Sequence, residues 1–141
     1  MNISIVYDSS TGKTKAAAEQ MAEAARAAGH TCTVESIERA DPAEVAAADA
    51  ICVGSWTKGL YVVFQGPTPA TLDFIGRLGR LDGKPASVFA TYALAIGKTL
   101  EKMSAALVAQ GATVSGRFKS KGPIAPEDFD DWLHDLSSSA S

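Results

Sequence analysis

Hydroxyl side chains are concentrated in one short segment near the start of the chain. Residues 9–14 read Ser-Ser-Thr-Gly-Lys-Thr and follow the apolar run of residues 3–7. Hydroxyl and backbone N–H groups bind phosphate oxygens, and the N-terminus of a following helix adds a favourable dipole. The segment therefore predicts a site for a monophosphate held without a metal ion. Its candidate ligands are Ser9, Ser10, Thr11, Gly12, Lys13 and Thr14.

Two other interpretations fit parts of this segment. A nucleotide-hydrolysing P-loop also ends in Gly-Lys-Thr, but its first glycine would fall at Tyr7, and the run at residues 50–55 carries no carboxylate for Mg²⁺. An ordinary helix-capping turn also favours Ser and Thr. Four hydroxyls and a glycine within six residues favour the phosphate site over such a turn. Lys13 has two possible positions, beside the phosphate or in solvent.

Aromatic side chains stand at the ends of two further apolar runs. Trp56 follows the run at residues 49–55, and Tyr92 ends the run at residues 85–92. An aromatic ring in such a position can stack on a flat, conjugated ligand. The alternative is that the apolar loop expected over residues 55–67 packs over the sheet edge. A phosphate loop with two aromatic residues predicts a ligand with a planar ring joined to a phosphate. The further candidates to bind this ligand are Ser55, Thr57, Lys58, Gly59, Thr91 and Ala93.

Alternating strand and helix patterns must position these loops. Five such strands predict one α/β domain, doubly wound, with a parallel sheet and helices on both faces. Ligands of such sheets bind at the carboxyl ends of the strands. The domain is expected over residues 1–136 and a disordered tail over 137–141. The expected strands are residues 2–7, 31–37, 49–55, 85–92 and 112–120, and the expected helices begin near residues 14, 42, 69, 99 and 126.

The composition excludes several classes of function. The chain has 141 residues, 46% hydrophobic residues and a net charge of −3, so neither nucleic acid nor an anionic membrane surface is an expected partner. No apolar run approaches the roughly 18 residues of a membrane span. Cys32 and Cys52 lie inside expected strands, which is typical of a reducing, cytoplasmic compartment. No His/Cys cluster predicts a metal site, and no acid–base pair predicts a catalytic residue.

The three loops together resemble those of the flavodoxin family. Residues 9–14 resemble its Ser/Thr-x-Thr-Gly-x-Thr phosphate motif, residues 54–57 its second loop, where an aromatic residue covers the flavin, and residues 89–92 the start of its third loop. The resemblance covers nearly the whole chain. It implies the strand order 2-1-3-4-5, bound FMN and electron transfer through the flavin edge.

The resemblance implies a soluble electron carrier that serves redox partner proteins, a reductase and an acceptor, as a monomer or weak dimer. Two features depart from the family pattern: Lys13 stands where an uncharged residue is usual, and the third loop lacks the usual acidic stretch. The Lys58-Gly59 peptide is the candidate to turn toward the flavin. The alternative functions are a flavodoxin-like NAD(P)H-dependent FMN reductase or quinone oxidoreductase, and a domain that has lost FMN and serves protein contacts.

Overall fold

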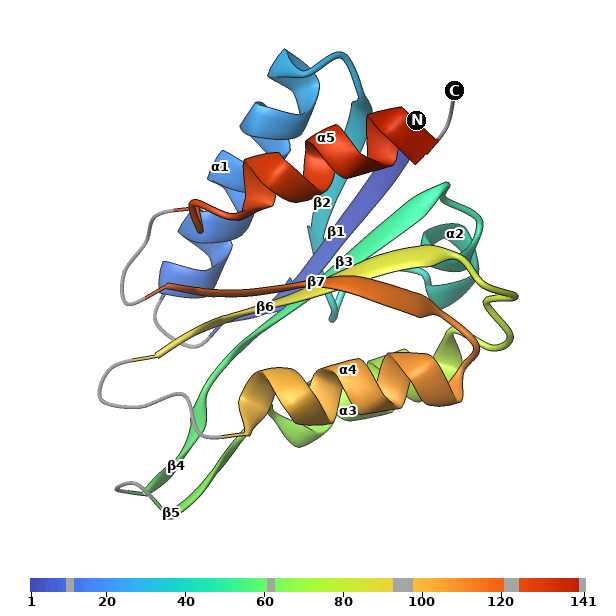
Figure 1. Ribbon diagram of the computed structural model, residues 1–141. Coiled ribbons are helices and arrows are strands. Elements are labelled where there is room, and N and C mark those ends of the chain that lie inside the picture. The colour runs from blue at the N-terminus through green and yellow to red at the C-terminus, as the bar shows by residue number, and fades with distance from the viewer. Residues whose placement is uncertain (10–11, 61–62, 93–97, 121–124, 140–141) are drawn as a thin grey trace.

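Five parallel strands form the centre of the protein. The computed structural model describes residues 1–9, 12–60, 63–92, 98–120 and 125–139 (Figure 1). The sheet has the order β2-β1-β3-β6-β7. Because β4 and β5 lie outside this sheet, the order is the predicted 2-1-3-4-5, and that prediction is confirmed. The strands are β1 (Asn2–Asp8), β2 (Thr31–Ser36), β3 (Ala50–Trp56), β6 (Pro85–Thr91) and β7 (Thr113–Ser120).

Helices cover both faces of the sheet, as predicted. Helices α1 (Lys13–Ala27) and α5 (Phe129–Ser139) pack on one face, and α3 (Pro69–Arg77) and α4 (Thr99–Ala109) pack on the other (Figure 1). The short helix α2 (Pro42–Ala46) adds Val45 to the second face. Helix α5 continues to Ser139, so three of the five residues expected in a tail are helical, while residues 140–141 lie outside the described residues.

Alternation along the strands divides the apolar side chains between two cores. On β1, Ile3 and Ile5 face α1 and α5, whereas Val6 faces α3 and α4. This alternation is the two-residue period of a strand buried on both sides. Cys32 and Cys52 are both free and buried, as expected for small core residues.

A β-bulge interrupts the edge strand β7. The pairing of β6 with β7 shifts by one residue, which leaves Ser115 as the extra residue. The Ser115 hydroxyl accepts a hydrogen bond from the Trp132 indole N–H at 2.9 Å. Beyond the bulge, the Phe118 ring packs edge-on against the rings of Phe129 and Trp132, with centroids 5.8 and 6.4 Å away. The contacts of Ser115 and Phe118 therefore hold α5 against β7.

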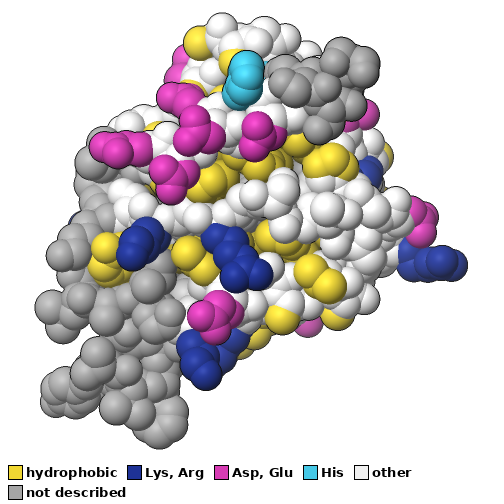
Figure 2. Space-filling model, in the orientation of Figure 1, with side chains coloured by type: hydrophobic (Ala, Val, Ile, Leu, Met, Phe, Trp, Pro, Cys, Tyr) yellow, Lys and Arg dark blue, Asp and Glu magenta, His cyan; other side chains and the backbone are white. Residues whose placement is uncertain are grey.

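Charged side chains are separated on the face that Figure 2 shows. Acidic side chains gather over α5, and basic side chains lie below them over β7. The exposed acids of α5 include Asp130, Asp131 and Asp135, and the exposed bases of β7 are Arg117 and Lys119. The Phe118 side chain enters the core beneath α1 and α5. Because side chains alternate along a strand, its neighbours Arg117 and Lys119 point to the opposite face of the sheet.

A two-stranded antiparallel hairpin projects from the carboxyl end of the sheet (Figure 1). It consists of β4 (Lys58–Leu60) and β5 (Val63–Gly66), with Lys58 paired to Gly66 and Leu60 to Val63. The sequence predicted a loop over residues 55–67 and did not predict these two strands within it. The β-branched and aromatic residues of the segment favour extended backbone. Residues 61–62 lie outside the described residues.

Candidate cofactor site

The carboxyl ends of β1, β3 and β6 meet at one edge of the sheet. Asp8 of β1 pairs with Ser55 of β3, and Trp56 of β3 pairs with Thr91 of β6. The three loops that the sequence singled out therefore leave the sheet side by side. The chain order of the strands reverses between β1 and β3, which is where open α/β sheets bind their ligands.

The first loop ends in a left-handed glycine that opens α1. Gly12 is the N-cap of α1 and has a φ of 90°, a conformation that is costly for residues with a side chain. Its N–H donates to the Ser9 hydroxyl at 3.1 Å. The first helical hydrogen bond runs from the Ala16 N–H to the Gly12 carbonyl at 2.9 Å. The N–H groups of residues 13–15 therefore have no partner within the helix, and such groups bind anions.

The side chains of this loop differ in their positions. Lys13 is exposed, and both of the positions that the sequence left open for it stay predictions. Thr14 is only 1% exposed, and its hydroxyl lies 2.6 Å from the hydroxyl of Thr91. Two candidate residues that are far apart in the sequence are thereby brought together. Ser10 and Thr11 lie outside the described residues, so their role as phosphate ligands stays a prediction.

The second and third loops are joined at the ends of β3 and β6. Trp56 is partly buried and pairs with Thr91, so both side chains point to the face of the sheet that α1 covers. The Thr57 N–H donates to the Thr91 carbonyl at 2.9 Å, and the Thr99 hydroxyl of α4 donates to the Thr57 hydroxyl at 3.3 Å. The Tyr92 N–H donates to a carbonyl of β7 at 3.1 Å. Lys58 and Gly59 belong to β4, and Ala93 lies outside the described residues.

The Ser55 hydroxyl points to the other face of the sheet and holds the start of α3. It donates to the Trp56 carbonyl at 2.8 Å and accepts from the Thr68 N–H at 3.1 Å. The Thr68 hydroxyl caps α3, donates to the Asp8 carboxylate at 2.5 Å, and lies 2.6 Å from the Thr71 hydroxyl. The sequence predicted a helix that begins near residue 69, but it did not predict the bond from Thr68 to Asp8. The available signal was a carboxylate directly after a buried strand.

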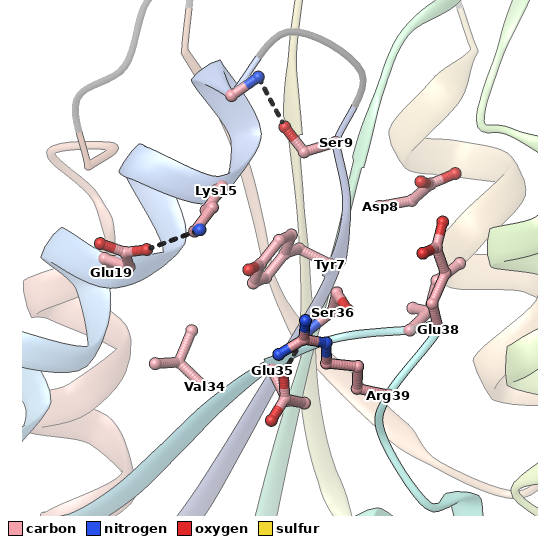
Figure 3. A pocket seen from close by; sticks show the side chains of 12 residues that line it. Tyr7, Asp8, Ser9, Lys15, Glu19, Val34, Glu35, Ser36, Glu38 and Arg39 are labelled. Carbon is pink, nitrogen blue, oxygen red and sulfur yellow. Dashed lines mark hydrogen bonds and ion pairs between the residues drawn. The ribbon is translucent and has the colours of Figure 1, made fainter.

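A pocket of about 530 Å³ lies beside the first loop, on the side of β2 (Figure 3). Carboxylates from β1, α1 and β2 surround it, together with Lys15 and Arg39. Burial raises the pKa of the Tyr7 phenol, the charges of Glu19 and Glu35 raise it further, and Arg39 opposes them. Excess negative charge disfavours a bound anion. We therefore expect the predicted phosphate at the N–H groups at the start of α1 and not in this pocket.

Comparison with known proteins identifies the family. The family model of flavodoxins matches residues 5–132, a span that contains all three loops. The chain belongs to the flavodoxin family. A solved structure of Megasphaera elsdenii flavodoxin in its two-electron-reduced form is 25% identical, with a TM-score of 0.80 over 97% of this chain and 98% of that chain.

Two further flavodoxin structures share the fold. One comes from the domain Archaea and is 23% identical, with a TM-score of 0.76 over 99% of this chain and 98% of that one. The other comes from Streptococcus pneumoniae TIGR4 and is 21% identical, with a TM-score of 0.80 over 99% of both chains. The search of curated proteins found no match.

The site of this flavodoxin fits the cofactor of its family. Flavodoxins bind FMN and transfer electrons to redox partners, and this is the function of the chain. The N–H groups at the start of α1, which have no partner within the helix, suit a phosphate, and the partly exposed Trp56 at the end of β3 suits a flat ring. Among the described residues, no helix is long and apolar enough to cross a membrane.

Proposed function

We propose that this flavodoxin holds the FMN phosphate at the N-terminus of α1 and the flavin ring between the loops that follow β3 and β6. The observation that carries the proposal is the convergence of these three strand ends beside N–H groups that lack helical partners. Bound FMN supplies the electron-transfer chemistry, and the protein supplies orientation and electrostatics.

In this proposal, backbone N–H groups make most of the contacts with the phosphate. The N–H groups of residues 13–15 point along the axis of α1, where the helix dipole favours negative charge. Gly12 allows the phosphate to approach the backbone closely because it has no side chain. Ser9, Ser10, Thr11 and Thr14 add hydroxyl donors. The exposed Lys13 adds positive charge at long range, where solvent screens it.

Aromatic side chains flank the ring end in this proposal. Trp56 is the last residue of β3, on the side of the sheet that α1 covers, and Tyr92 follows β6 one residue beyond Thr91. Ser55 and Thr57 shape the second loop through hydrogen bonds to its backbone and to α4. The remaining candidates around the ring are Lys58, Gly59 and Ala93.

The carrier role is supported by the place of the site at the edge of the sheet. A flavin held there presents its edge to an approaching protein, so a reductase and an acceptor can use the same surface in turn. We infer a monomer or weak dimer that works in the cytoplasm, and the two free, buried thiols are consistent with a reducing compartment.

The absorption spectrum of the purified protein, followed by addition of NADPH, tests this proposal. A yellow protein that NADPH alone does not bleach, but that a separate reductase does, is the expected result. Direct bleaching by NADPH with turnover on a quinone would replace the carrier with the reductase alternative. A colourless protein that takes up no added FMN would overturn the cofactor site itself.

A further inference from the structure

Thr14 and Thr91 form a buried hydrogen bond between the phosphate loop and the flavin side of the sheet. Their hydroxyl oxygens are 2.6 Å apart, and the residues are 1% and 2% exposed. Thr14 lies in the first turn of α1, and Thr91 is the last residue of β6. A short bond between two buried hydroxyls fixes both side chains, because a buried polar group without a partner is costly.

The direction of this bond decides what Thr14 can do. A hydroxyl donates one hydrogen and can accept two. If Thr14 donates to Thr91, its only hydrogen is used within the protein. If Thr91 donates to Thr14, the hydrogen of Thr14 remains free for a second acceptor. An anion at the start of α1 favours the second arrangement, since hydrogen bonds to a charged acceptor are the stronger ones.

We propose that Thr91 is a positioning residue for the phosphate site and makes no essential contact with the flavin ring. It donates to Thr14 and so directs the Thr14 hydroxyl toward the FMN phosphate. This inference rests on the proposed position of FMN. Thr91 ends the strand that leads into the third loop. Among the described residues, its contact with the second loop is made by its backbone, through the carbonyl that accepts the Thr57 N–H at 2.9 Å.

The division between side chain and backbone makes the proposal testable. Thr91→Val keeps the shape and the backbone bond to Thr57 but removes the hydroxyl. Riboflavin has the ring of FMN and lacks its phosphate. In titrations of the apoprotein, Thr91→Val should weaken FMN binding by roughly tenfold and leave riboflavin binding unchanged. Thr91→Ser should restore the wild-type ratio of the two dissociation constants.

Further variants separate this role from general damage. Thr14→Val should also lower FMN affinity selectively, and the double variant should lose no more than Thr14→Val alone, because the two hydroxyls act as one unit. Thr71→Val is the matched control. It removes an equally short bond of 2.6 Å, to Thr68, on the other face of the sheet, and should leave the ratio at its wild-type value. Thr91→Ala provides a second deletion of the hydroxyl without added bulk.

The outcomes are distinct. Selective loss of FMN affinity in Thr91→Val or Thr91→Ala, with rescue by serine, supports the positioning role. An equal loss for FMN and riboflavin overturns it, because Thr91 would then serve the ring or the fold. Unchanged FMN affinity overturns it as well. Wild-type protein that binds riboflavin as tightly as FMN would instead refute the phosphate site on which the proposal rests.

Discussion

The ring of Phe89 occupies the space that a side chain at position 54 would need. A Cβ built on Gly54 would lie 2.0 Å from Cζ of Phe89, far inside any real contact. The two residues pair across β3 and β6, and Phe89 is fully buried. The absence of a side chain at Gly54 therefore lets the Phe89 ring lie across β3, two residues before the strand ends at Trp56.

Replacing Gly54 with alanine should destabilise the protein. The added methyl group forces the ring of Phe89 or the strand to move, and overpacking of this kind costs roughly 1–3 kcal/mol. Urea unfolding of the apoprotein measures the change. Gly76→Ala is the control, because a Cβ there meets nothing within 4 Å and the residue lies in α3. That variant should be neutral or more stable, by up to roughly 1 kcal/mol. Equal stability of Gly54→Ala and wild type would contradict the packing argument.

Removing the side chain of Trp56 should make bound FMN brighter and its binding weaker. Stacking on an aromatic ring quenches flavin emission, and losing such a stack costs roughly 1–3 kcal/mol by analogy with nucleobases. Fluorescence titration of Trp56→Ala with FMN measures both effects. Trp132→Phe is the matched control, since Trp132 is 2% exposed and packs within α5 and β7. If Trp56→Ala behaves as Trp132→Phe does, Trp56 has no contact with the flavin.

The two thiols should be nearly inert in the folded protein. Burial raises the pKa of Cys32 to about 11 and that of Cys52 to about 12. Because the thiolate is the nucleophile, labelling should be slow: only about one Cys32 in a thousand would be ionised at pH 8, and fewer of Cys52. A thiol reagent should therefore label the native protein slowly and both cysteines rapidly in denaturant. Fast labelling of the native protein at wild-type stability would contradict these shifts.

The same shifts predict a loss of stability in alkaline solution. Both pKa values are raised above the ordinary value of 9.0, so the folded protein favours the protonated thiols. Their contribution is fully present below pH 9 and is lost as the pH rises from 9 toward 11 and 12, because only the unfolded chain then releases its protons. The urea concentration at the midpoint of unfolding, measured at pH 7, 9 and 10.5, should follow this decline in stability. The Cys32→Ala/Cys52→Ala variant should show a smaller decline over the same range.

The Thr68 side chain should contribute to both the stability of the fold and the affinity for FMN. Thr68→Val removes the N-cap of α3 and the bond to Asp8, so the free energy of unfolding should fall by about 1–2 kcal/mol. FMN affinity should fall with it, because the lost bond to Asp8 helps to fix the backbone of Thr68, whose N–H donates to Ser55 of β3. Thr68→Ser keeps the hydroxyl and should retain most of both properties. Calorimetry of the apoproteins and FMN titration provide the two readings.

The parallel sheet was predictable because segments with helical periodicity lie between the expected strands. Leu100, Met103 and Leu107 recur at helical spacing, and Gly111 ends that pattern. The hairpin of β4 and β5 was missed because the segment lacks an Asn-Gly or Asp-Gly turn. The β-branched and aromatic residues around Val63 were the signal that favoured strands.

The contacts within the site were beyond prediction from local patterns. Hydroxyl residues in the first loop indicated a phosphate, but the partner of Thr14 is 77 residues away in the sequence. Choosing Thr91 requires the register of β3 against β6 and the packing of α1 across both. The same holds for Asp8 and Thr68, which are 60 residues apart. Periodicity predicts which face a side chain occupies, but not which side chain it meets there.

The Thr14–Thr91 bond joins residues that are 77 positions apart in the sequence, and this separation affects when the bond can form during synthesis. Contacts between residues far apart in the sequence form late, because the loop that joins them must first be closed. As the chain leaves the ribosome, β1 and α1 emerge well before β6, so the first loop exists for a time without its partner. We therefore expect FMN uptake to be a late event in biosynthesis. Nascent chains that stop before β6 should remain colourless even where the first loop is complete.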